Sequence, residues 1–187
     1  MEKKSLKPQP FIYPLPALLV SCGSKPEDFN LLTVSWAGTL CSNPPLCYIS
    51  VRPERHSHKL LMENMEYVIN LTTTQLLEAT DCCGIISGKD VNKFEATGLT
   101  PSMAEMVSAP IVMEAPLSIE CRVKEVISLG SHDMFVSEVI NILADTRYID
   151  PETGKFSYAA ANPLVYAQHG YYGLGELLGT YGYTAKK

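Results

Sequence analysis

Short apolar runs bounded by Pro, Gly or Asn recur along the first half of the chain. They are rich in Val, Ile and Leu, the composition that is typical of β-strands. None is long enough to form a sizeable helix, and turn-forming residues separate one run from the next. We therefore predict strands over residues 17–22, 31–36, 47–51 and 67–71.

Strict alternation of apolar and polar residues marks the second half. In LSIECRV (117–123), every second residue is apolar, which indicates a strand with one buried face. The alternation slips at Lys124-Glu125-Val126, where we expect a β-bulge. A second long run, residues 132–149, is also rich in β-forming residues. This half is therefore expected to contribute two long strands.

Helical patterns are few. Residues 57–65 have apolar positions at helical spacing with Ser57 as a candidate N-cap, and about 73–83 follows a candidate capping box of Thr72 and Gln75. Residues 90–110 form a polar excursion with short helical turns. Long bulged strands with few helices favour a closed or split barrel over a doubly wound sheet. We expect one mainly β domain over residues 1–187.

Composition and charge narrow the class of protein. Apolar residues make up 46% of the 187, enough for a large core, and the formal net charge is −5. An acidic chain is not a general nucleic-acid binder, because such binding depends on a basic surface. Four prolines between positions 8 and 16 interrupt the apolar residues near the N-terminus, and no run approaches the roughly 20 residues that span a bilayer. We expect a soluble, cytoplasmic protein with no membrane partner.

The six cysteines do not form a metal-binding or redox motif. They lie at positions 22, 41, 47, 82, 83 and 121, and no C-x-x-C pair is present. Cys82 and Cys83 are adjacent, and adjacent cysteines seldom bridge because the geometry is strained. Reduced, mostly buried thiols are expected, as in a reducing compartment.

A local basic cluster stands out against the acidic total. RPERHSHK (52–59) places Arg52 and Arg55 at the predicted start of the first helix, beside Ser57. Helix N-termini offer unpaired N–H groups and a positive dipole end, so this segment could bind an anion such as a phosphate. Lys93 could join it from another loop. A solvated basic loop and a solvated lone lysine are the alternatives.

The segment WAGTLCSNPP (36–45) contains small residues that would let a ligand approach the main chain closely. Ala37 and Gly38 lack bulk, so a flat ligand could approach the main chain, while Thr39 adds a hydroxyl. Trp36 could form the wall of a slot, although a single Trp is more often part of a core. We interpret the segment as a turn whose exit is fixed by two prolines. An apolar slot near an anion site suits a flat, phosphorylated cofactor.

Other candidate groups are weaker. His132 follows a Gly-Ser turn at a predicted strand start and could face a cofactor, or could be an ordinary surface histidine. His169, beside several tyrosines, is similarly ambiguous. GLGELLG (173–179) is not a dinucleotide fingerprint, because its third glycine is one place late and too few residues follow. No Ser-His-Asp or Cys-His arrangement and no acid pair at informative spacing is evident.

Seven segments, in order, resemble a known family. They are NLLTVSWAGTLCSNPP, ISVRPERHSHKLL, VINLTT, DCCGIISGKDVNKF, APLSIEC, LGSHDMFVSEV and PLVYAQHGYYGLGELLGTYG. Together they are similar to the flavin reductase-like FMN-binding split-barrel family, and most of all to its flavoredoxin branch. Each motif alone is weak, but seven in sequence over nearly the whole chain are specific.

The resemblance implies a homodimer of Greek-key split barrels, each with FMN in a groove near the subunit interface. It implies that FMN is held along its whole length, with one group of residues at the flavin and another at the phosphate. The residues implied to line the isoalloxazine and ribityl region are Asn30, Trp36, Ala37, Gly38 and Thr39. Those implied to lie near the phosphate are Arg52, Arg55, Ser57 and Lys93. His132 would lie beside the flavin, and Tyr166 or Tyr171 would cover a ring face.

Two activities are consistent with this resemblance. The first is an oxidoreductase that passes electrons from NAD(P)H through FMN to free flavin or a similar acceptor. The second is a flavoredoxin-type electron carrier that keeps FMN tightly bound, has no NAD(P)H activity, and exchanges electrons with redox proteins. A cofactor-binding protein with neither activity is the third alternative. Because the flavin supplies the redox chemistry, we expect cofactor-site residues and no catalytic acid or base.

Overall fold

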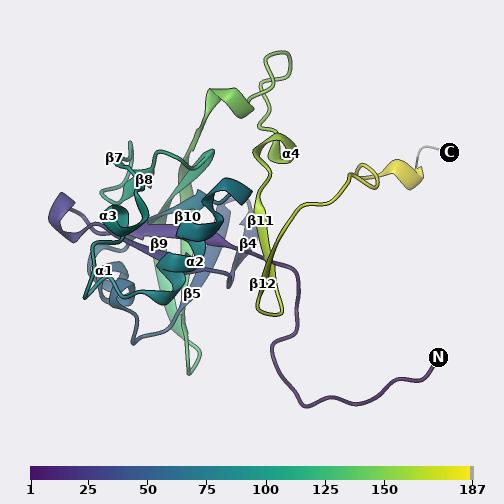
Figure 1. Cartoon of the computed structure of the whole chain (residues 1–187), viewed down its shortest axis with the longest axis horizontal. Coiled ribbons are helices and arrows are strands. Elements are labelled where there is room, and N and C mark those ends of the chain that lie inside the picture. Colours follow the sequence, from purple (N-terminus) through teal and green to yellow (C-terminus); the bar gives the residue numbers. More distant parts are fainter. Residues whose placement is uncertain (186–187) are drawn as a thin grey trace.

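A seven-stranded antiparallel sheet forms the centre of the computed structural model, which describes residues 1–185 (Figure 1). Its strand order is β3-β2-β6-β9-β10-β5-β4, and a three-stranded sheet β1-β11-β12 and a hairpin β7-β8 lie beside it. The strands are β1 Leu15–Pro16, β2 Leu18–Cys22, β3 Asn30–Val34, β4 Ala37–Ser42, β5 Pro45–Val51, β6 Glu66–Leu71, β7 Pro101–Met103, β8 Pro110–Val112, β9 Leu117–Ser128, β10 Asp133–Ala144, β11 Leu164–Ala167 and β12 Gly170–Gly173; the helices are α1 His56–Asn64, α2 Leu77–Ile85, α3 Lys93–Thr97 and α4 Tyr158–Ala161.

The two edge strands of the large sheet, β3 and β4, are consecutive in the chain. Only Ser35 and Trp36 connect them, so the sheet curls until its two edges meet. No ladder joins β3 to β4 in the described sheet, and the barrel is therefore open along this line. We call this line, where Ser35–Trp36 links the two edges, the seam.

Inward-facing side chains of the sheet form the main core. It contains fifteen buried residues, among them Val20, Ile49 and Phe135, and two of the fifteen, Leu60 and Leu61, come from α1. Burial of this many aliphatic and aromatic side chains is the main stabilising term of the fold. The mainly β prediction with few helices is confirmed.

A second core lies on the outer face of β2 and β3. Leu19 and Leu31 point outward and pack with Leu76 and Cys83 of the α2 region and with Phe94 of α3. Strands β2 and β3 are therefore buried on both faces. This explains why their sequences are nearly continuous apolar runs, in contrast to the alternating pattern of β9.

The predicted bulge is present in β9. Along the β9–β10 ladder, Val136 pairs with Glu125 and the next residue, Ser137, pairs with Val123. Lys124 is thus the extra residue, inside the predicted interval. A bulge increases the local twist of a ladder, which helps the two longest strands to follow the barrel wall.

Three local predictions were wrong. The segment after Trp36 is not a turn, because residues 37–42 form β4 and the turn lies at Asn43–Pro44. Neither predicted N-cap is present. The N-cap residue of the first helix is Arg55 and not Ser57. The Thr72 hydroxyl donates to the Ala17 carbonyl and does not cap a helix. The β-rich run over residues 132–149 contains β10, which ends at Ala144 before a 3-10 turn.

Both terminal segments run away from the barrel (Figure 1). Large apolar side chains on them are exposed, including Ile12 in the first segment and Leu177 and Leu178 in the second. Among residues 1–185, no helix has the length and apolar character needed to cross a membrane.

Candidate functional site

Two adjoining hollows of about 420 Å³ each lie beside β3, and the first of them reaches the seam. They share Leu32, Arg52 and Arg55, so they form one continuous cleft with two ends. We call the first the aromatic hollow and the second the cationic hollow. The aromatic hollow is also lined by Thr33, Val34, Ser35, Trp36, Ser50, Val51, Asp81, Gly84, Ile85, His132, Tyr166 and Tyr171, and the cationic hollow by Glu54, His56, Ser57, Ile86, Ser87, Gly88 and Lys93.

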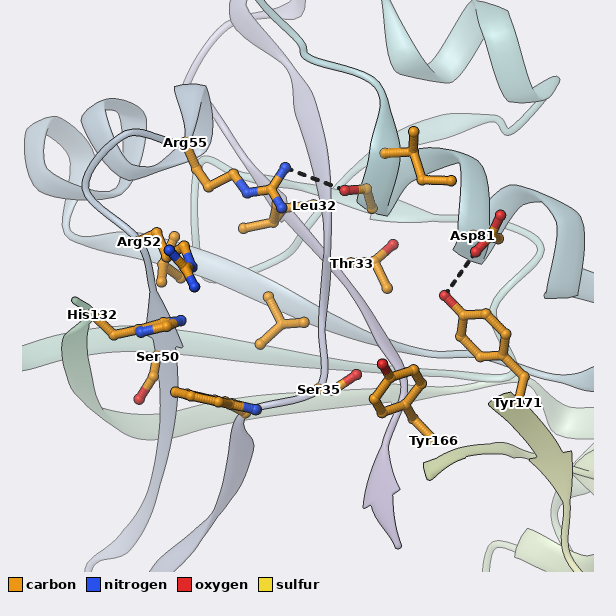
Figure 2. A pocket seen from close by; sticks show the side chains of 15 residues that line it. Leu32, Thr33, Ser35, Ser50, Arg52, Arg55, Asp81, His132, Tyr166 and Tyr171 are labelled. Carbon is orange, nitrogen blue, oxygen red and sulfur yellow. Dashed lines mark hydrogen bonds between the residues drawn. The ribbon is translucent and has the colours of Figure 1, made fainter. Parts of the chain in front are cut away.

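The start of α1 forms one wall of the cationic hollow. Helix α1 begins at His56, and its N-cap residue Arg55 makes no side-chain capping bond. The first N–H groups of the helix are therefore free of a side-chain acceptor, which favours an anion there. Arg55 reaches across to the other wall, where its Nη1 donates to the Gly84 carbonyl of α2 at 3.2 Å (Figure 2).

Lys93 is the most unusual residue of this end. Its side chain is buried, with 3% of the residue exposed, and Nζ donates to the Cys83 carbonyl at 2.7 Å. No ion pair among the described residues includes Lys93, although buried ammonium groups are normally paired with an acid. Burial lowers the pKa of this lysine. An anionic ligand in the hollow would supply the missing partner.

A buried hydrogen bond supports the floor of the cationic hollow. Asn30 Nδ2 donates to Ser57 Oγ at 2.7 Å, and both residues are buried. Gly88 packs directly over this pair, because a Cβ at that position would lie 2.1 Å from Asn30 Oδ1. The turn after α2 can therefore approach the floor only with glycine at position 88.

Flat rings form one end of the aromatic hollow. The Trp36 and His132 rings stack with centroids 4.3 Å apart and an interplanar angle of 27°. Trp36 is 40% exposed, so it is a wall of the cleft and not part of the core. Its carbonyl accepts from the Ser50 N–H at 2.8 Å, which holds the link against β5. Burial and the nearby Arg52 charge lower the pKa of His132, which favours the neutral ring.

Two tyrosines form the opposite end (Figure 2). Tyr166 and Tyr171 pair directly across β11 and β12, and their ring centroids lie 5.6 Å apart. Tyr171 Oη donates to Asp81 Oδ1 of α2 at 3.1 Å. Burial and this contact with a carboxylate raise the pKa of Tyr171 to about 12, so its hydroxyl stays protonated. The sequence left the choice between the two tyrosines open, and the structure places both at the hollow.

Comparison with known proteins identifies the family. The model of the "Flavin reductase like domain" matches residues 11–175, which is most of the chain. The chain belongs to the flavin reductase-like family. An uncharacterized protein of Archaeoglobus fulgidus is 32% identical over 140 residues, covering 75% of this chain and 78% of that protein.

Solved structures agree with this assignment. The flavoredoxin of Desulfovibrio vulgaris (Miyazaki F) superposes with a TM-score of 0.91 and 29% identity, covering 99% of this chain and 100% of that one. A flavoredoxin from Methanosarcina acetivorans gives 0.91 and 26%, covering 100% and 98%. The FMN-binding protein from Thermus thermophilus, at 0.80 and 23% identity over 96% and 99%, shows the shared fold alone. The predicted split barrel and the resemblance to flavoredoxin are confirmed.

Membership of the flavin reductase-like family suggests a flavin cofactor, and the cleft of this chain fits one. A buried ammonium without an acid partner and two guanidinium groups suit a phosphoryl group, while flat rings and seam backbone suit a planar heterocycle. The ammonium and the flat rings line different hollows of one cleft, and the two guanidinium groups line both.

The twelve residues predicted from the sequence fall into two groups. Nine of the twelve belong to the cleft or its floor, and the other three belong to β4. Trp36, Arg52, Arg55, His132, Tyr166 and Tyr171 line the aromatic hollow, Ser57 and Lys93 line the cationic hollow, and Asn30 lies beneath it. Ala37, Gly38 and Thr39 line neither hollow; Ala37 faces the core, and Gly38 approaches Tyr48.

Sequence reasoning missed the contribution of α2 and of the turn that follows it. Asp81, Gly84 and Ile85 line the aromatic hollow, and residues 86–88 line the cationic one. The Ser-Gly pair before Lys89 is a turn signal that could have indicated a close backbone approach. Nothing local to the sequence indicates that this turn lies against the start of α1.

The contact over Asn30 gives a direct test of the cleft floor. Gly88→Ala should push Asn30 away from Ser57 and lower the free energy of unfolding by about 1–3 kcal/mol, because a buried amide loses its partner. Urea unfolding measures the change. Gly175→Ala is the control, since a Cβ there meets no atom within 4 Å. Equal stability of the two variants would contradict the assigned role of Gly88.

Proposed function

We propose that this flavin reductase-like protein binds FMN, with the phosphate in the cationic hollow and the ring system in the aromatic hollow. The observation that carries the proposal is the buried ammonium of Lys93, which has no carboxylate partner among the described residues. Ser57 and Arg55 would add donors from the start of α1. One cationic end matches the single phosphate of FMN.

The flavin, when bound, supplies hydride and single-electron transfer. The chain's own residues bind and orient it. Trp36 and His132 would bound the ring at one end and the tyrosine pair at the other, while the seam backbone offers N–H and C=O groups to its polar edge. Burial lowers the pKa of His132, which favours a neutral ring that can hydrogen-bond without adding charge.

As its activity we propose an oxidoreductase that takes electrons from NAD(P)H and passes them through FMN to free flavin or a redox protein. Family membership supports it, together with a cleft open at the seam. The alternative is a flavoredoxin-type carrier that keeps FMN bound, has no NAD(P)H activity, and exchanges electrons with protein partners. Similarity to two flavoredoxins over nearly the whole chain favours the alternative.

We also propose a homodimer. Exposed apolar side chains on the two terminal segments lack cover within one chain, among them Phe11, Ile12, Leu177, Leu178 and Tyr181. A second copy would remove them from water, which is the main driving force of subunit association.

Substitution of the buried lysine tests the phosphate assignment. Lys93→Met should weaken FMN binding by about ten- to a hundredfold, because a charged hydrogen bond is lost, and should leave riboflavin binding nearly unchanged. The ligand-free variant should not lose stability, since an unpaired charge leaves the interior. Titration of the apoprotein with each flavin measures both affinities. Lys89→Met, at an exposed position nearby, is the control; equal losses for FMN and riboflavin would refute the assignment.

Anaerobic mixing with reduced nicotinamides separates the two activities. In the reductase, NADH or NADPH should bleach the visible absorption of bound FMN in stopped-flow measurements. Failure of both nucleotides, with chemical reduction by dithionite still effective, would eliminate the reductase and leave the carrier. Loss of FMN on gel filtration would count against the carrier, because a carrier must retain its cofactor.

Charges on the C-terminal segment test the dimer. The double variant Leu177→Glu, Leu178→Glu should sediment as a monomer, whereas the wild-type protein should sediment at twice the 20.6 kDa chain mass. Glu176→Lys changes a charge on the same segment without removing an apolar group and should remain dimeric. A wild-type protein of 20.6 kDa in solution would overturn the proposal.

A further inference from the structure

A partly buried His–Asp pair lies beside the cleft in the chain without lining either hollow. His58 Nε2 and Asp133 Oδ2 are 2.7 Å apart, and their side chains are 13% and 15% exposed. The other ion pairs of the described residues each include a side chain that is at least half exposed. This pair is therefore the one that is shielded from solvent on both sides.

Each member of the pair is the chain neighbour of a cleft residue. His58 follows Ser57 of the cationic hollow, and Asp133 follows His132 of the aromatic hollow. The contact spans 75 residues of sequence. It joins the start of α1, which carries the cationic end, to the β9–β10 turn, which carries the ring-stacking histidine.

Packing fixes both partners in place. The His58 ring lies edge-on to the fully buried Phe135, with centroids 5.5 Å apart. Asp133 is the first residue of β10, and it pairs with Val51 and Ser128, the last residues of β5 and β9. The Leu129 N–H donates to the His132 carbonyl and closes the turn between β9 and β10. The pair thus connects two rigid elements and not two mobile loops.

We propose that His58 and Asp133 are positioning residues that set the spacing between the two ends of the cleft. The inference rests on the proposed FMN site. A ligand held at both ends gains from its second contact only if the two subsites stay at the spacing that the ligand spans. If the pair is lost, each subsite can still bind its own part of the flavin, but the phosphate adds less to the affinity of the whole molecule.

The measurable quantity is the ratio of the Kd for riboflavin to the Kd for FMN, which reports how much the phosphate adds. His58→Leu should reduce this ratio about tenfold, because the two contacts no longer reinforce each other. His58→Gln should keep the wild-type ratio, since Gln Nε2 can still donate to Asp133. Asp133→Ser removes the other partner, because the serine side chain is too short to reach His58, and should reduce the ratio by the same factor. This variant replaces His58→Leu in the test if His58→Leu does not fold.

A matched control lies one residue away. Lys59 and Glu63 form an exposed pair on the same helix, at 3.7 Å and 75% and 55% exposed. Lys59→Leu should leave the ratio unchanged. Fluorescence titration of the apoproteins with each flavin gives the ratio, and a variant that is only less stable would lose affinity for both flavins equally.

The outcomes separate this inference from the function it rests on. A reduced ratio in His58→Leu and Asp133→Ser, restored in His58→Gln, supports the positioning role. An unchanged ratio in the first two variants, or an equal fall in Lys59→Leu, overturns it while leaving FMN binding intact. A wild-type protein that binds FMN no more tightly than riboflavin would instead refute the proposed phosphate site.

Discussion

The two-residue connection between the edges of the large sheet is the constraint on which the rest of the structure depends. Val34 and Ala37 are three virtual bonds apart, so their Cα atoms lie within about 11 Å of each other. A flat seven-stranded sheet would separate its first and last strands by about 29 Å. The sheet must therefore curl into a barrel. The chain closes the barrel covalently at a place where no hydrogen-bond ladder does.

An open seam would normally be a liability, because edge strands expose unpaired backbone groups. Here α2 covers β3: Gly84 packs over Thr33, and the Thr33 hydroxyl donates to the Thr80 carbonyl. The tyrosine pair covers the seam from the small sheet. What remains uncovered is a cleft between α1 and α2, with seam backbone along one side. The same feature that closes the barrel thus provides the surface on which the proposed flavin would lie.

The cleft carries several positive side chains, although the net charge of the chain is −5. Arg52 and Arg55 line both hollows, and Lys93 lines the cationic one. Among residues 1–185 no acid pairs with the buried Lys93, and an unpaired buried charge costs stability in the ligand-free fold. In the proposed function, the phosphate of FMN supplies the missing partner. The stacked Trp36 and His132 rings lie in the aromatic hollow, and the partly buried His58–Asp133 pair joins the chain neighbours of residues from both hollows.

The sequence by itself indicated six strands of the large sheet, the bulge at Lys124 and the family, because period, turn residues and ordered motifs are local properties of the chain. It also indicated that Arg55 and Lys93 could share a site. Only the tertiary structure decided that Trp36 links two sheet edges, that Ala37–Thr39 continue as a strand, and that His58 meets Asp133. These outcomes depend on how the sheet closes. Closure of the sheet brings together residues dozens of positions apart, and local sequence patterns do not predict which of them will be in contact.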